Sequence, residues 1–116
     1  MYTALPTTFS MTKLTIRDSL QKLSGHSEKF ITLFRHGTLE VEIYKPGKVD
    51  PQKPHSRDEV YVIAAGSGEF LCGEKQSFTA GDVLFVPARA EHRFVNFTDD
   101  FSTWVFFYGP EGGETR

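Results

Sequence analysis

The stretch GKVDPQKPHSRDEVYVIAAG, residues 47–66, places His55 four residues before Glu59, which begins an apolar run rich in β-branched residues. Taken alone, this pattern favours nothing more than a charged turn that enters a β-strand. A second stretch, GDVLFVPARAEHRFVN at residues 81–96, carries another histidine, His92. Side chains two apart on a strand share a face, so the two stretches can direct His55, Glu59 and His92 into one interior.

The spacing within these stretches carries a family resemblance. The first reads G-x5-K-x-H-x3-E-x6-G from Gly47, and the second reads G-x5-P-x-R-x2-H-x3-N from Gly81. Together they resemble the two signature motifs of the cupin superfamily, G-x5-H-x-H-x(3,4)-E-x6-G and G-x5-P-x-G-x2-H-x3-N. Two fixed positions differ, because Lys53 replaces the first histidine and Arg89 replaces the glycine after proline. The resemblance implies an all-β fold, a double-stranded β-helix or jelly-roll barrel.

The three residues that could bind a metal are two histidines and one glutamate. Such a set is similar to a facial-triad centre, which leaves positions open for water, oxygen or substrate. We therefore expect His55, Glu59 and His92 to hold a divalent metal, with Fe(II) favoured and Mn, Ni, Co or Zn as alternatives. The competing interpretation is a metal-free pocket, in which Glu59 caps a turn and the histidines are exposed or hydrogen-bonded.

Lys53 stands where the resemblance implies a fourth ligand. A protonated amine cannot coordinate a metal, and burying it beside a cation is costly. We therefore expect Lys53 to point outward, to lose its proton or to pair with an anionic substrate. Pro51 and Pro54 can disturb the strand alternation here, and Gln52 could then offer its amide oxygen to the metal or to its water.

Four residues are assigned to a substrate pocket: Lys53, Tyr61, Arg89 and Phe94. Tyr61 is also a weak candidate for a catalytic residue, and core packing is the alternative role for both aromatic rings. Arg89 either binds an anion near the barrel mouth or is an exposed loop residue. Because arginine disfavours a positive φ, we expect the turn at Arg89 to differ from the family turn.

The rest of the chain predicts one short N-terminal helix followed by strands. Residues Thr15 to Leu23 show helical spacing, and Gly25 stands just beyond them. In the second strand, apolar residues alternate with Glu40 and Glu42, which predicts one solvent-exposed face. The predicted strands are a hairpin of 29–37 and 38–47, three strands within 59–88 separated by turns at 66–68, 73–75 and 80–82, and then 92–100 and 101–109.

The composition restricts the cell compartment and the binding partners that we expect. The 116 residues carry 13 Lys and Arg against 15 Asp and Glu, with no basic stripe, so nucleic acid is not an expected partner. No apolar run approaches the roughly 18 residues of a membrane helix, and the single cysteine, Cys72, suits a cytoplasmic protein. We expect one domain at 12–110, a loose tail at 1–11 and a frayed end at 111–116. The strand at 101–109 is apolar on both faces, which predicts a homodimer interface on its outer face.

Two functions fit these observations. The first is a metal-dependent enzyme acting on a small organic molecule, with oxidation by a dioxygenase most favoured and isomerisation or decarboxylation next. The second is a non-catalytic binding module for a sugar or an organic acid, with or without metal. The lack of a general base beyond the metal ligands and Tyr61 favours the oxidative enzyme, whereas the lost fourth ligand favours the binding module.

Overall fold

The computed structural model describes residues 11–115, so the tail expected at 1–11 lies outside the described residues except for Met11. The elements, in chain order, are α1 (Ile16–Ser24), β1 (Phe30–His36), β2 (Leu39–Tyr44), β3 (Asp58–Ala65), β4 (Ser67–Cys72), β5 (Glu74–Thr79), β6 (Val83–Val86), β7 (Arg93–Val95) and β8 (Ser102–Tyr108).

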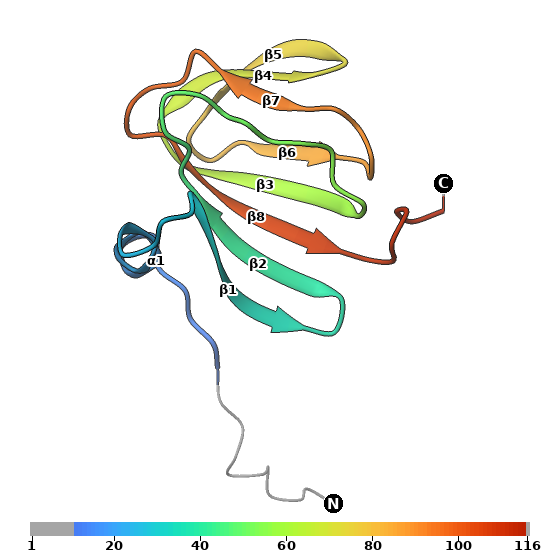
Figure 1. Cartoon of the computed structure of the whole chain (residues 1–116), viewed down its shortest axis with the longest axis horizontal. Coiled ribbons are helices and arrows are strands. Elements are labelled where there is room, and N and C mark those ends of the chain that lie inside the picture. The colour runs from blue at the N-terminus through green and yellow to red at the C-terminus, as the bar shows by residue number, and fades with distance from the viewer. Residues whose placement is uncertain (1–10, 116) are drawn as a thin grey trace, which may run out of the picture.

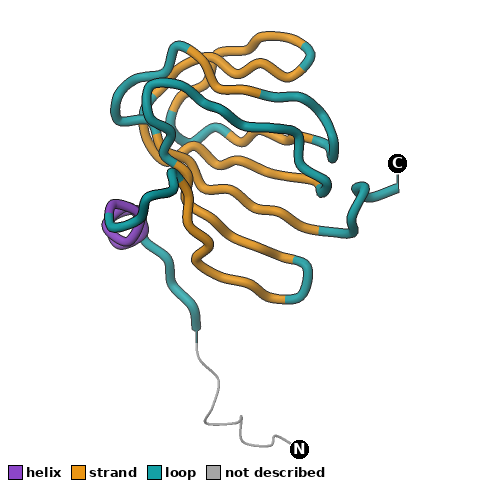
Figure 2. Tube along the Cα trace, in the orientation of Figure 1, coloured by secondary structure: helices purple, strands orange, loops and turns teal. Residues whose placement is uncertain are grey.

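The strands form two antiparallel sheets (Figure 1). The larger sheet has the strand order β1-β2-β8-β3-β6, and the smaller has the order β5-β4-β7. The last strand, β8, lies between β2 and β3, so strands distant in sequence are neighbours in space. Loops gather at the two ends of the strands (Figure 2). The predicted all-β jelly-roll fold is confirmed.

The predicted helix is also confirmed as α1. The side-chain oxygen of Thr15 accepts a hydrogen bond from the N–H of Asp18 at 3.1 Å and so caps the first turn. Leu23 is buried where α1 packs against β1 and β2. Within residues 11–115, neither this helix nor any other is long and apolar enough to cross a membrane.

Aromatic rings fill the space between the two sheets. Tyr61 of β3, Phe70 of β4 and Phe94 of β7 contact one another, with ring centroids 4.8 to 5.9 Å apart. Phe78 and Phe101 extend the cluster on the far side of Phe94. Each buried ring removes about 150–250 Å² of surface from water. The packing of this cluster therefore fixes the position of the two sheets relative to each other.

The number and length of the strands differ from the sequence prediction. The middle of the chain contains four strands, β3 to β6, where the sequence predicts three, because the three Gly-containing turns separate four strands. β4 begins at Ser67, directly after Gly66, whose φ of 86° lets the chain turn sharply. The predicted strand at 92–100 is shortened to Arg93–Val95, because Asn96 has a φ of 52° and leaves the strand conformation.

β2 does not have the solvent-exposed face that the sequence predicts. Glu42 and Tyr44 are only 9% and 6% exposed, and both contribute to the barrel interior. Val41 and Ile43, on the other face, are buried as well. A strand covered on both faces keeps its alternating pattern, but the pattern no longer indicates which side is inside.

The outer face of the larger sheet is apolar along its centre. β8 alternates as predicted, with Val105 and Phe107 buried toward the core. Its outward side chains continue across the neighbouring strands through Trp104, Phe106, Val60, Val62, Val83 and Phe85. Val83 and Phe85 are exposed. The homodimer expected on this face stays a prediction.

The segment after β8 returns to the barrel. The N–H of Gly112 donates to the carbonyl oxygen of Ser56 at 2.6 Å, and the N–H of Glu114 donates to the carboxylate of Asp58 at 2.8 Å. These bonds attach the C-terminal residues, for which the sequence predicts a frayed end, to the loop before β3 and to its first residue.

Candidate metal centre

Glu59 is a buried carboxylate on a central strand. It is the second residue of β3, is 1% exposed, and pairs with Phe107 of β8 and Val86 of β6. Strand alternation puts Glu59 on the same face as Tyr61 and Ile63, which are both buried. An ionised carboxylate in such an apolar interior costs several kcal/mol unless it is compensated.

Two histidines approach Glu59 from different segments. Nδ1 of His55, in the loop before β3, and Nε2 of His92, just before β7, each lie 3.3 Å from Oε1 of Glu59. The ligand atoms of all three residues lie within 4.8 Å of one another. The structure therefore brings together the three residues that the sequence predicts to share a site.

The hydrogen bond at Nδ1 of His92 determines the protonation of Nε2, the nitrogen that faces Glu59. Nδ1 lies 3.0 Å from the carbonyl oxygen of Ala90, so in the neutral ring Nδ1 carries the proton and Nε2 has a free lone pair. That lone pair faces the Glu59 carboxylate and, at 3.3 Å, the amide oxygen of Gln52. Three acceptors facing one another repel, and a proton or a metal ion between them removes the repulsion.

The other polar atoms of the cluster also lack partners. Within residues 11–115, the buried side-chain atoms that make no hydrogen bond are Nδ1 of His55, both carboxylate oxygens of Glu59 and Oγ of Ser102. All but the last belong to the cluster. Because buried polar atoms are nearly always hydrogen-bonded, this concentration marks the cluster as a possible cation site. Imidazole nitrogen and carboxylate oxygen are common ligands of divalent first-row metals, so the residues fit such an ion.

His55 is the member of the cluster that solvent reaches, because its side chain is 35% exposed. Its polar contact with Glu59 raises the pKa of His55 above the usual 6.5, and burial only partly offsets this effect. Without a metal, a proton on His55 can therefore act as a counter-charge for Glu59. Metal binding would release that proton.

Gln52 is the neighbour of Lys53 that turns toward the site. Its Oε1 accepts a hydrogen bond from the hydroxyl of Tyr61 at 2.8 Å and faces His92, whereas its Nε2 donates to Asp50 at 3.0 Å. The amide orientation follows from these partners, because a carboxylate can only accept. The amide oxygen of Gln52 therefore lies where it could coordinate a metal in place of the histidine that Lys53 replaces.

Asp50 holds this arrangement and was missed by the sequence analysis. It is 1% exposed, and besides the amide of Gln52 it accepts hydrogen bonds from the backbone N–H groups of Gln52 at 3.2 Å and Phe94 at 2.9 Å, and from the hydroxyl of Tyr44. The only sequence signal is an aspartate two residues before Gln52, the spacing of an Asx turn. The bond to Phe94 in β7 cannot be read from that local pattern.

Lys53 points outward, which is one of the outcomes that the sequence predicts. It is exposed and lines a cavity of about 590 Å³ that reaches Gln52 and His92 from another side. Pairing of Lys53 with an anionic substrate stays a prediction.

Arg89 behaves differently from the expectation. Its φ is 68°, so the turn keeps the left-handed backbone that suits the glycine of the cupin pattern, and the expected change of turn is wrong. Its N–H donates to the carbonyl oxygen of His55 at 2.6 Å, and its guanidinium lies against Gly112. The backbone of Arg89 thus braces His55, while its side chain lies against the C-terminal segment.

The two aromatic pocket candidates have separate roles. Phe94 is 1% exposed and packs within the aromatic core, so core packing describes it better than a pocket wall. Tyr61 is fully buried, but its hydroxyl reaches Gln52. Burial and the charge of Glu59 raise the pKa of Tyr61 well above its usual value, so this hydroxyl stays protonated and acts as a donor.

A cavity of about 360 Å³ opens onto His55 and Gln52. Glu42 also lines it, and burial together with the neighbouring Glu40 raises the pKa of Glu42 to about 7. The hydroxyl of Thr32 donates to Glu42 at 3.3 Å. The sequence analysis missed Glu42 because the alternation of β2 places it on a solvent face.

The family follows from a match that spans both halves of the site. A family model described as "Cupin domain" matches residues 40–108. The chain belongs to the cupin family. This match includes every residue of the cluster.

Three relatives show how far this cupin resembles known proteins. An uncharacterized protein of Streptomyces coelicolor is 33% identical over 85 residues, which cover 71% of this chain and 81% of that protein. A Cupin 2 conserved barrel domain protein of Salinispora arenicola is 20% identical with a TM-score of 0.64, covering 87% of this chain and 90% of the other. The DMSP lyase DddQ of Ruegeria pomeroyi is 26% identical with a TM-score of 0.58, over 69% of this cupin and 46% of the lyase.

Proposed function

We propose that this cupin binds one divalent metal ion through His55, Glu59 and His92 and acts on a small organic molecule at that ion. The observation that carries the proposal is the cluster of buried ligand atoms without hydrogen bonds around Glu59. Two histidines and one carboxylate favour Fe(II), with Mn, Ni, Co or Zn as alternatives. When bound, such a metal polarises a substrate oxygen and leaves positions open for dioxygen or water.

The protein's own residues prepare this site. The Ala90 carbonyl holds the ring of His92 so that Nε2 faces inward. Asp50 holds Gln52 so that its amide oxygen faces the same point. This oxygen is suited to serve as a fourth, neutral ligand or to hold a water molecule. The Tyr61 hydroxyl, which stays protonated, stabilises the Gln52 orientation as a donor.

The cavity above His55 suits a small substrate. Its volume of about 360 Å³ is near the lower end of the usual range for ligand sites. Phe30, Val105 and Phe107 give it apolar walls that limit the access of water. Oxidation by dioxygen is the reaction we favour, with isomerisation or decarboxylation next. Glu42, with its pKa near neutrality, adds a group that can accept or donate a proton, which the last two reactions require.

The alternative function is a non-catalytic module that binds a sugar or an organic acid. The outward position of Lys53, beside the cavity that reaches His92, supports this alternative, because an ammonium there could pair with an acid. This module could act with or without metal, and the metal-free version has less support, because a pocket without metal gains nothing from an uncompensated Glu59. Among the solved neighbours, the DMSP lyase is an enzyme, which supports an enzymatic role without fixing the reaction.

Metal content after anaerobic reconstitution with Fe(II) tests the proposal. Protein purified without chelator and then reconstituted should hold about one ion per chain. His55→Ala and His92→Ala should each lower that content sharply, because each removes a ligand, and should leave the circular dichroism spectrum unchanged. The matched control is His36→Ala, since His36 is exposed at the end of β1.

Wild-type protein that holds under about 0.2 ion per chain after reconstitution would contradict the proposed metal centre. Retention of the ion in both histidine variants would place it elsewhere. Dioxygen consumption with panels of small organic acids, thiols and phenols then separates the enzyme from the binding module, since the module should bind such compounds without turnover.

A further inference from the structure

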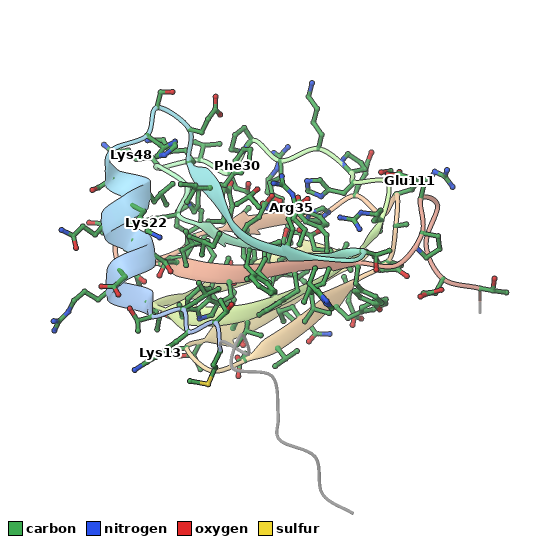
Figure 3. All side chains as sticks on the ribbon, turned by 90° about the horizontal axis from the view of Figure 1, so that it is seen from below. Lys13, Lys22, Phe30, Arg35, Lys48 and Glu111 are labelled. Carbon is green, nitrogen blue, oxygen red and sulfur yellow. The ribbon has the colours of Figure 1, made fainter. Side chains whose placement is uncertain are left out.

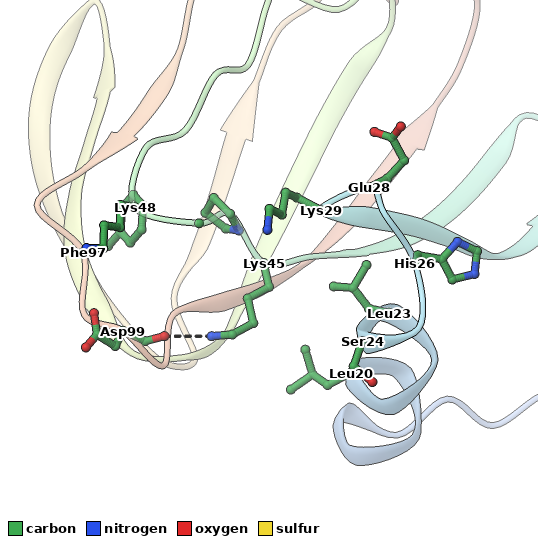
Figure 4. Close-up of a pocket in the computed structure, with 12 residues that line it drawn as sticks. Leu20, Leu23, Ser24, His26, Glu28, Lys29, Lys45, Lys48, Phe97 and Asp99 are labelled. Carbon is green, nitrogen blue, oxygen red and sulfur yellow. Dashed lines mark hydrogen bonds between the residues drawn. The ribbon is translucent and has the colours of Figure 1, made fainter.

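A third cavity, larger than the two described above, lies between α1 and the loops at one end of the barrel (Figure 4). Its volume is about 700 Å³, within the usual range of small-molecule sites. It brings together segments that are distant in sequence: the end of α1, the residues on both sides of the β1–β2 hairpin, and the loop between β7 and β8. Nothing in the metal chemistry proposed above uses it.

One part of the wall is apolar. Leu20 and Leu23 of α1 face the cavity together with Pro46 and Phe97 (Figure 4). Leu23 is also part of the buried core of the chain, so this wall is held by packing and does not depend on exposed side chains alone. A hydrocarbon or aromatic body can contact this wall.

Three lysines give another part of the wall a positive charge. Lys29, Lys45 and Lys48 all line the cavity, and none has a carboxylate within ion-pair distance among the ion pairs of residues 11–115. Nζ of Lys45 is held in place, because it donates to the carbonyl oxygens of Asp99 at 2.8 Å and Phe101 at 3.3 Å. Neutral carbonyls orient this ammonium without cancelling its charge.

Two acidic residues, Glu28 and Asp99, also line the cavity. Figure 4 shows the carboxylate of Glu28 directed away from the labelled lysines, and it is the backbone oxygen of Asp99 that meets Lys45. Figure 3 shows Lys48 near α1, at the same end of the molecule. The three cations therefore line the cavity without a carboxylate partner among the described residues, and an anion that enters it gains from their charge.

We propose that this cavity is a binding site for a small amphipathic anion, a carboxylate, sulfonate or phosphate group attached to an apolar body. The apolar body lies against Leu20, Leu23 and Phe97, and the anionic group lies among the three lysines. Glu28 and Lys29 also line the cavity that opens onto His55, so the bound anion sits beside the entrance to the metal centre. Binding itself requires no metal.

A pair of probes that differ in charge tests this site. 8-Anilinonaphthalene-1-sulfonate carries an aromatic body and a sulfonate, whereas N-phenyl-1-naphthylamine has the same rings without the charge. In metal-free full-length protein with EDTA present, fluorescence titration should show that the sulfonate binds at least about tenfold more tightly than the amine, because only it meets the lysines. Its affinity should fall as salt is raised.

The lysine variants locate the binding. Lys29→Gln with Lys48→Gln should weaken sulfonate binding by about tenfold or more and leave binding of the amine unchanged. These two side chains make no hydrogen bond within the described part of the chain, so the fold should not depend on them; Lys45 is left intact because it holds two carbonyls. The matched control is Lys13→Gln with Lys75→Gln, which removes the same charge outside this cavity.

Equal affinity for the two probes would overturn the proposal, because the sulfonate would then gain nothing from the lysines. So would equal sulfonate affinity in the Lys29/Lys48 variant and in the Lys13/Lys75 control. Because every titration is done without metal, a failure here leaves the metal centre untouched, and loss of the metal centre leaves this test valid.

Discussion

Two carboxylates lie buried in this barrel with almost no exposed surface, and their surroundings are opposite. Asp50 accepts hydrogen bonds from two backbone N–H groups, an amide and a tyrosine hydroxyl. Glu59 is equally buried, and neither of its oxygens accepts a hydrogen bond. A carboxylate surrounded by donors stabilises the fold by itself, whereas one facing only other acceptors and a titratable histidine is suited to a cation. The same chemical group therefore has a structural role at Asp50 and, in the function proposed above, a ligand role at Glu59.

Glu59→Gln should have the largest effect on metal binding. Loss of a charged ligand should lower metal affinity by about 1,000-fold, well beyond the 10–100-fold typical of residues behind the ligands. The metal-free variant should be more stable than metal-free wild type by about 1–2 kcal/mol, because a neutral amide can donate to Nε2 of His92 and no uncompensated carboxylate remains in the cluster. The measurements are metal titration calorimetry and urea denaturation, both starting from chelator-treated protein.

The same variant has a spectroscopic readout. Because Glu59 raises the pKa of His55, Glu59→Gln should lower that pKa toward 6.5 in an NMR titration of metal-free protein. His36, which is exposed, serves as the internal reference. A variant that binds metal as wild type does, or that loses stability when metal-free, would show that Glu59 has no ligand role.

Asp50→Asn should have the opposite effect on stability. The new NH₂ group would face donors in place of an acceptor, so we expect the free energy of unfolding of the metal-free protein to fall by about 3 kcal/mol. Equilibrium urea denaturation checks this loss. Unchanged stability would mean that the hydrogen bonds around Asp50 contribute nothing net, and the contrast with Glu59 would disappear.

Variants of the neighbouring residues Gln52 and Lys53 test which of the two side chains belongs to the metal site. Gln52→Leu removes the oxygen that faces His92, so metal affinity should fall by about tenfold. Lys53→Gln should change that affinity by less than about twofold, because the exposed ammonium lies outside the cluster. Titration of both variants with the same metal makes each the control for the other, and equal losses would contradict the assignment of Gln52 to the site.

Glu42 gives an effect on stability that depends on pH. The folded-state pKa of Glu42 is raised from 4.5 to about 7, so its contribution to stability is full below pH 4.5 and is lost as the pH rises through 7. Glu42→Gln should therefore make metal-free protein about 2 kcal/mol less sensitive to a change from pH 5 to pH 8. Denaturation at the two pH values measures this, and an unchanged pH dependence would show that Glu42 ionises as freely as in the unfolded chain.

The strands could be predicted from sequence where alternation coincides with a buried face. Glu59, Tyr61 and Ile63 of β3 follow this rule, and motif spacing then adds His55 and His92 to the site. Alternation fails in β2, because Val41 and Glu42 are buried on opposite faces. It also fails in the loop before His55, where the position of Gln52 depends on Asp50, and Asp50 is in turn held by Phe94 from a strand far along the chain. Long-range hydrogen bonds of this kind leave no periodic signal in the sequence.

Arg89 shows that backbone conformation cannot always be predicted from the residue type. The sequence rule that arginine avoids a positive φ is sound on average, but the bond from the Arg89 N–H to the His55 carbonyl and the packing against Gly112 hold the turn in place. Tertiary contacts can offset the roughly 1 kcal/mol cost of that backbone conformation.

The central claim is that the unsatisfied atoms around Glu59 are the ligands of a metal ion. An anomalous difference map from crystals of protein reconstituted with Fe(II), collected at the iron absorption edge, tests it most directly. We expect a single strong peak bounded by Nδ1 of His55, the Glu59 carboxylate and Nε2 of His92, and no peak there in Glu59→Gln. A peak at another place, or none in wild-type crystals, would contradict it.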